Sequence, residues 1–176
     1  MIFAATFAGI EIAAAQDVFE LTAPPNESVR IVEATLAQTS DFQEAQDEIL
    51  SIQMVRGHTT AGSGGAAVTP VPWNKYGGTT EATVARNNTT IASAGSAQTL
   101  YADGWNVRAG WYWRAPPLRN SGRIDVQPQT SPHAGKGLFM PEQMVIGPGE
   151  TFVVRLSLPA DTMTSLGSLI FETLGA

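Results

Sequence analysis

The side chains best suited to metal binding are few in this chain and widely spaced. Only two histidines occur, His58 and His133. A histidine-based metal site in a β-barrel enzyme would place two histidines one residue apart with a glutamate nearby, and the chain has no such grouping. We therefore interpret each histidine as a loop residue and expect no metal ligand at either position.

Nucleophilic catalysis has no recognisable motif either. The chain contains no cysteine, which excludes thiol catalysis, thiolate metal sites and disulfides. A Ser-His-Asp site would need a histidine beside a serine, but no Gly-x-Ser-x-Gly sequence is present. Gly62, Gly64 and Gly65 are not followed by Gly-Lys-Ser/Thr, so a phosphate loop is not indicated.

Paired carboxylates of the glycosidase type are the remaining route to catalysis. The candidates are Glu11, Glu20, Glu33, Glu142, Glu150 and Glu172. Those in strand-like segments, such as Glu33 and Glu172, are typical of outward-facing residues that guard a sheet against unwanted pairing. We therefore expect no catalytic residues and no cofactor, and keep an enzyme as the least favoured alternative.

Composition and charge argue against two classes of partner. The net charge is -6, and nucleic-acid readers usually carry a basic stripe. Arginines 108, 114, 119 and 123 are interleaved with Trp111, Tyr112 and Trp113, a pattern that could stack bases, but the overall acidity opposes it. No apolar run approaches the roughly 20 residues that span a bilayer. We expect neither nucleic acid nor membrane as a partner.

Apolar residues alternate with polar ones in most of the chain, which predicts strands. The stretch from Ser28 to Gly57 holds two such segments, 28–38 and 49–57, joined by an acidic connection. Further strands are expected at 17–22, 80–85, 98–114, 123–126, 144–146, 150–158 and 167–174. Short strands separated by Pro- and Gly-rich turns favour an all-β fold, an antiparallel β-sandwich of the jelly-roll kind.

Two segments stand apart from this regular pattern. Residues 1–15 are apolar and alternate in part, and we interpret them as an N-terminal strand or arm that precedes a single β-sandwich domain, residues 16–176. Residues 58–80 are rich in Gly, Pro and Thr and predict a long projecting loop. Its large residues Val71, Trp73 and Tyr76 either cover one end of the sandwich or contact a neighbouring chain.

Several phrases together resemble small virion structural proteins of tailed bacteriophages. They are AAAQDVFELTAP, VRIVEATLAQTSD, ILSIQMVRGHTTAGSGGAAVTP, NNTT, WNVRAGWYWRAPP, VIGPGETFVVRLSLPAD and SLIFETL. The resemblance extends over nearly the whole chain. It implies a jelly-roll-like capsid decoration or cement protein, which binds the outside of the capsid and stabilises it after assembly in the bacterial cytoplasm.

The resemblance also implies partners, namely the major capsid protein and further copies of the chain, most simply as a homotrimer. We expect residues 1–15 and the loop 59–78 to make these contacts, through Phe3, Phe7, Ile10, Val71, Trp73 and Tyr76. The alternative is a tail or head-fibre component that binds host carbohydrate through exposed Trp and Tyr side chains.

Overall fold

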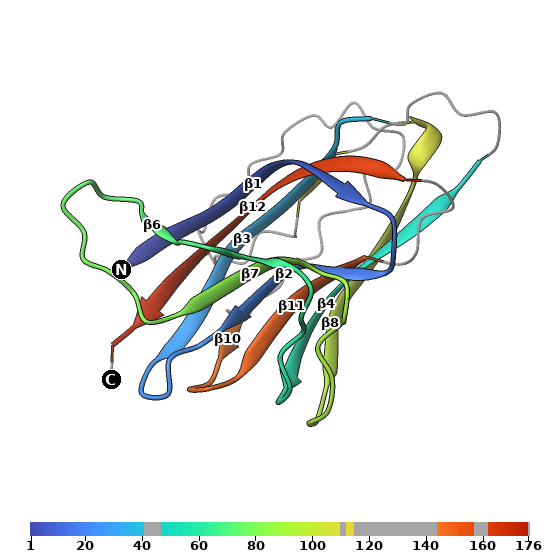
Figure 1. Ribbon diagram of the computed structural model, residues 1–176. Helices are drawn as coiled ribbons and strands as arrows, with labels where there is room; N and C mark the ends of the chain where they lie inside the picture. The colour runs from blue at the N-terminus through green and yellow to red at the C-terminus, as the bar shows by residue number, and fades with distance from the viewer. Residues whose placement is uncertain (41–46, 110–111, 115–143, 157–161, 176) are drawn as a thin grey trace, which may run out of the picture.

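The computed structural model describes residues 1–40, 47–109, 112–114, 144–156 and 162–175. Within these ranges the chain forms two antiparallel sheets that pack face to face (Figure 1). The expected strand at 123–126 and the predicted histidine loop around His133 lie outside the described residues.

The described residues contribute six strands to each sheet. In sheet A the order is β10 (Val145–Ile146), β3 (Ser28–Gln38), β12 (Met163–Leu174), β1 (Ile2–Ile12) and β6 (Val71–Pro72), and β9 (Tyr112–Arg114) also pairs with β3. In sheet B the order is β5 (Ala66–Val68), β7 (Thr83–Asn88), β2 (Gln16–Thr22), β11 (Thr151–Leu156), β4 (Ile49–His58) and β8 (Gln98–Asn106).

The connectivity is that of a jelly roll. The first four strands alternate between the sheets, with β1 and β3 in sheet A and β2 and β4 in sheet B. The last two long strands fill the gaps that this alternation leaves: β11 lies between β2 and β4, and β12 lies between β1 and β3. Two sheets built in this way cover each other's apolar face, and the predicted all-β sandwich is confirmed.

The core lies between the sheets and is built from the alternation visible in the sequence. Phe152, Val154 and Leu156 point inward from β11, as expected for a strand with one buried face. From sheet A, Phe3 stacks on Phe171, with their ring centroids 5.7 Å apart. Across the sandwich, Phe7 of β1 and Phe19 of β2 have centroids 5.1 Å apart, so aromatic contacts join the two layers.

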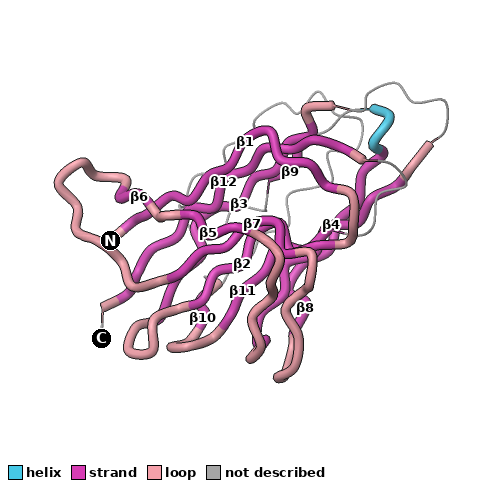
Figure 2. Tube along the Cα trace, in the orientation of Figure 1, coloured by secondary structure: helices cyan, strands magenta, loops and turns pink. Residues whose placement is uncertain are grey.

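The two strands predicted within residues 28–57 are confirmed as β3 and β4, which belong to sheet A and sheet B respectively. Another segment differs from the sequence-based expectation. The stretch 98–114 is not one strand: β8 ends at Asn106, a 3-10 turn covers Val107–Ala109, and β9 then continues in sheet A (Figure 2). Val107 is fully buried at this crossing, which places it in the core between the sheets.

The segment between β4 and β8 wraps around one edge of the sandwich. Its strand β5 extends sheet B beyond β7, whereas β6 pairs with β1 at the edge of sheet A. Residues 73–82 then project from this edge before β7 returns to sheet B (Figure 1). The long loop predicted at 58–80 is therefore partly ordered as strand.

Candidate functional sites

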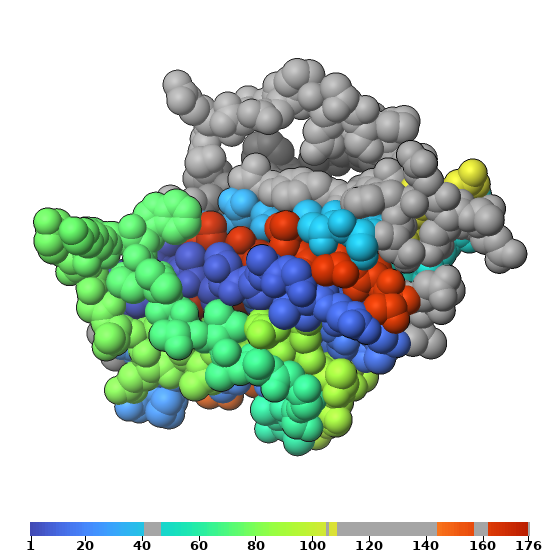
Figure 3. Space-filling model, turned by 45° about the horizontal axis from the view of Figure 1, so that its top comes forward, coloured from blue at the N-terminus to red at the C-terminus, as the bar shows by residue number. Residues whose placement is uncertain are grey.

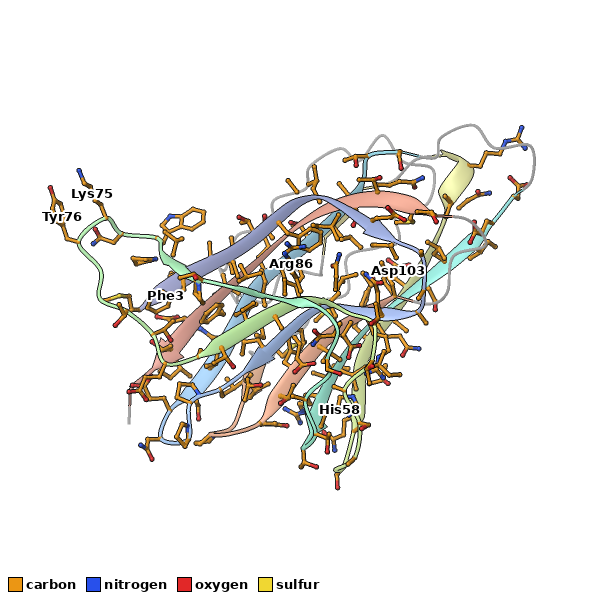
Figure 4. All side chains as sticks on the ribbon, in the orientation of Figure 1. Phe3, His58, Lys75, Tyr76, Arg86 and Asp103 are labelled. Carbon is orange, nitrogen blue, oxygen red and sulfur yellow. The ribbon has the colours of Figure 1, made fainter. Side chains whose placement is uncertain are left out.

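Exposed aromatic side chains gather at the projecting end of the molecule. Val71, Trp73 and Tyr76 are 61%, 67% and 89% exposed. Tyr76 and Lys75 lie at the outermost point of the loop and point away from the sandwich (Figure 4). In the space-filling view the same segment extends past the N-terminal end of β1 (Figure 3). We call residues 71–78 the tip.

Backbone hydrogen bonds hold the tip in one conformation. The Trp73 N–H donates to the Ile2 carbonyl oxygen at 2.9 Å, which fixes the tip to β1. The Asn74 side chain accepts from the Tyr76 N–H at 3.1 Å, and the Gly77 N–H donates to the Asn74 carbonyl at 2.7 Å. An Asx turn of this kind substitutes for secondary structure. The aromatic groups are thus presented on a preorganised turn, which lowers the entropy lost on binding.

The predicted contact residues of the N-terminal segment have a different location. Phe3 and Phe7 are buried in the chain's own core, and Ile10 is partly buried against it. Residues 2–12 form a strand that pairs along most of its length with β12. These side chains therefore pack inside this molecule, and of the six candidates Val71, Trp73 and Tyr76 are the exposed ones.

A second grouping, of buried polar residues, lies on the outer face of sheet B. Asp17 is fully buried and forms an ion pair with Arg155, with Asp17 Oδ1 2.6 Å from Arg155 Nε. Its Oδ2 accepts from the Ala92 N–H at 2.7 Å, while Arg155 Nη2 donates to the Ala92 carbonyl at 2.9 Å. Both polar groups of the Ala92 backbone are therefore satisfied by one ion pair.

Glu20 holds a neighbouring loop in the same way. Its Oε2 accepts from the Gly62 N–H at 2.8 Å and from Asn88 Nδ2 at 2.9 Å. A Cβ at position 62 would lie 2.7 Å from this oxygen and 2.5 Å from the Thr90 carbonyl oxygen, so only glycine fits there. Glu20 is 4% exposed, and its carboxylate is enclosed by the donors that it binds.

The loops that these carboxylates hold also pair with each other. Residues 59–65 follow β4 and residues 89–97 follow β7; we call them together the crossed loops (Figure 2). Thr60 forms an antiparallel bridge with Ser93, and Ser63 forms one with Thr90. Ala92 of the second loop packs with Val55 and Val153 of the strands below in a small apolar cluster separate from the main core. The crossed loops thus cover part of the outer face of sheet B.

A β-bulge explains why two acids three residues apart share this face. In the ladder between β11 and β2, Val154 pairs with Phe19 and Arg155 pairs with Asp17, so the register shifts at Val18. The extra residue restores the outward direction of Asp17, which a regular strand would point opposite to Glu20. Alternation alone could not have revealed this grouping, and the sequence analysis missed it.

The chemistry of the buried cluster is that of structural hydrogen bonding. His58, interpreted from sequence as a loop residue, ends β4 and is buried, with Nε2 3.5 Å from Arg155 Nη2. Among the described residues no group of three or more histidine, aspartate or glutamate side chains is arranged to hold a metal ion. No helix in the described part of the chain is long and apolar enough to cross a membrane.

The arrangement therefore offers one exposed, preorganised aromatic tip and one buried network that fixes two loops. The first can bind a partner and the second can stabilise the fold. Comparison of the chain with protein-family models, curated protein sequences and solved structures finds no match.

Proposed function

We propose that this protein is a structural component of a bacteriophage particle, a capsid decoration or cement protein that binds the outside of the capsid through its tip. The observation that carries the proposal is the exposure of Trp73 and Tyr76 on a turn fixed by Asn74. Trp and Tyr are the residue types most enriched where protein interfaces concentrate their binding energy.

The jelly-roll framework supports this role. Two sheets that share a buried core, with Phe7 packed against Phe19 across it, form a framework that can carry a projecting binding element without rearrangement. The particle context comes from the resemblance of the chain's sequence phrases to phage virion proteins alone, since the comparisons find no match. The partners are then the major capsid protein and further copies of this chain, with a trimer as the simplest assembly around a symmetry axis.

The proposal is tested by co-sedimentation of the purified protein with particles that lack it. Replacing Trp73 and Tyr76 together by alanine removes the two aromatic anchors and should weaken binding at least about tenfold. The matched control is Ile49→Ala, because Ile49 is an equally exposed apolar side chain at the start of β4, in the other sheet. Wild-type binding by the double variant, or equal losses in the control, would overturn the proposal.

A second function is favoured by the same exposed rings, since aromatic faces also stack on sugars. In that case the protein is a tail or head-fibre component that binds host carbohydrate. Host polysaccharide should then quench the fluorescence of Trp73, and the Trp73→Ala variant should lose the quenching. Particle binding that persists without Trp73 and Tyr76, combined with this quenching, would favour the carbohydrate role.

A further inference from the structure

The two crossed loops and their flanking residues share a residue pattern. Arg56, Thr59, Thr60, Ser63, Gly65 and Ala67 recur in the same order and spacing as Arg86, Thr89, Thr90, Ser93, Gly95 and Ala97. The backbone repeats as well. Gly57 and Asn87 occupy corresponding positions, and their φ angles are 86° and 55°. Gly64 and Ala94 are a second corresponding pair, with φ angles of 84° and 56°. Two non-glycine residues therefore adopt the left-handed conformation where the first segment uses glycine.

The contacts repeat with the pattern. Thr60 corresponds in the pattern to Thr90, and Ser63 corresponds to Ser93. The bridge between Thr60 and Ser93 therefore has its equivalent in the bridge between Thr90 and Ser63. Gly62 and Ala92 correspond, and the N–H of each donates to a buried carboxylate of β2, Glu20 for the first and Asp17 for the second. Both carboxylates belong to β2, which together with β11 lies between β7 and β4, the strands that lead into the two segments.

We infer that residues 56–67 and 86–97 are two copies of one structural motif, and that together they act as a single conformational lock on the outer face of sheet B. Asp17 and Glu20 hold both segments against β2, because Glu20 binds Gly62 of the first segment and the Asn88 side chain of the second, and Asp17 binds Ala92 of the second. The two segments are also joined to each other by their two bridges. The lock therefore opens as one unit, so that loosening either carboxylate releases both loops.

The coupling follows from how closely the two halves approach. A Cβ at Gly95 would lie 2.4 Å from the Gly57 carbonyl oxygen, and one at Gly65 would lie 2.1 Å from the Arg86 carbonyl oxygen. Thr60 and Ser93 exchange two backbone hydrogen bonds of 3.0 Å. If one loop moves away from the sheet, it breaks hydrogen bonds that also satisfy backbone groups of the other loop. Buried backbone groups left unpaired raise the free energy of the folded state, so we expect the second loop to open as well.

Hydrogen–deuterium exchange of the full chain tests the lock. Glu20→Gln replaces a charged acceptor by a neutral one and should raise the exchange of peptides covering 59–66 by about tenfold or more. Because the halves are coupled, exchange of peptides covering 89–97 should rise by a similar factor, although Glu20 reaches that segment through the side chain of Asn88, at the end of β7, and not through the backbone of the loop. The matched control is Glu172→Gln, which weakens the partly buried Arg30–Glu172 pair of sheet A and should leave both loops unchanged.

Faster exchange confined to residues 59–66, or none in either loop, would overturn the inference. A disulfide provides an independent measurement if Glu20→Gln does not fold. Thr60→Cys and Ser93→Cys place the two sulfurs on directly paired residues of a chain that has no other cysteine. Oxidation should slow exchange throughout both loops and reduction should restore it, whereas slowing limited to the residues next to the bridge would contradict a single lock.

Discussion

Buried and exposed carboxylates contribute differently to stability, and this chain offers both kinds in ion pairs. Asp17 is fully buried against Arg155, whose side chain is 20% exposed. Asp47 pairs with Arg108 at 3.7 Å, and the two side chains are 68% and 50% exposed. Water screens the second pair and supplies hydrogen bonds to either partner when the other is removed, whereas the first pair has no such substitute.

We therefore expect Asp17→Asn to lower the free energy of unfolding by about 3 kcal/mol, because it leaves the Arg155 guanidinium without its counter-charge in a mostly buried site. Asp47→Asn should change it by about 0–1 kcal/mol. Urea denaturation followed by circular dichroism measures both. Equal losses in the two variants would show that the Asp17 pair is no more important than a surface pair.

At the scale of elements, β1 is an integral strand of sheet A. It contributes Phe3, Ala5, Phe7 and Ile12 to the core and pairs with β12 from Ile2 to Ile12. An arm that only contacts neighbouring chains could be removed without loss of the fold, but this strand could not. The expectation that residues 1–15 bind a partner through Phe3 and Phe7 is thus replaced by a role in folding.

Deletion of residues 1–12 should abolish cooperative unfolding, since it removes two aromatic core side chains and exposes the edge of β12. The measurement is a thermal melt followed by circular dichroism, with the Trp73→Ala, Tyr76→Ala double variant as a control of unchanged fold. A sharp transition near the wild-type temperature in the truncated chain would support a detachable arm instead.

The sequence predicted where strands occur better than which sheet they join. The alternation of Phe152, Val154 and Leu156 reports a local property, the direction of successive side chains, and β11 matches it. The sheet that a strand joins depends on strands far away in the sequence. The sequences of β3 and β4 therefore show the same alternation although the two strands lie in different sheets. For the same reason the period-two pattern continued through residues 107–109, where the chain turns from one sheet to the other.

The same distinction applies to the candidate sites. Val71, Trp73 and Tyr76 were predicted as contact candidates because they are large residues in a stretch rich in Gly, Pro and Thr, and they are exposed. The cluster around Asp17 and Glu20 depends on a bulge and on two loops that meet in space, which no local pattern reports. Its one sequence signal was the recurrence of the Arg-x-x-Thr-Thr-x-x-Ser pattern, which leads from the preceding strand into each loop.

For the molecule as a whole, the tip and the lock occupy separate parts of the sandwich. The tip projects beside the start of β1, and the crossed loops cover sheet B (Figure 1). We therefore expect substitutions in the tip to leave hydrogen exchange of the crossed loops unchanged, and substitutions in the lock to leave the tip unchanged.

A decoration protein is expected at high copy number in purified particles. Quantitative mass spectrometry against the major capsid protein should give a ratio near one to one for a protein that covers the whole lattice. A handful of copies per particle would instead place the protein in the tail or at a vertex, and its absence from particles would refute the proposed virion role.

The burial of Asn88 has a consequence for production in a host that attaches N-linked sugars. Asn88-Thr89-Thr90 and Asn26-Glu27-Ser28 are both acceptor sequences. Asn26 is exposed in the turn between β2 and β3, whereas Asn88 is 2% exposed and its amide donates to Glu20. The folded protein can therefore accept a glycan at Asn26 but not at Asn88. Glycan occupancy at Asn88 relative to Asn26 would then record how early during synthesis the loop closes over sheet B.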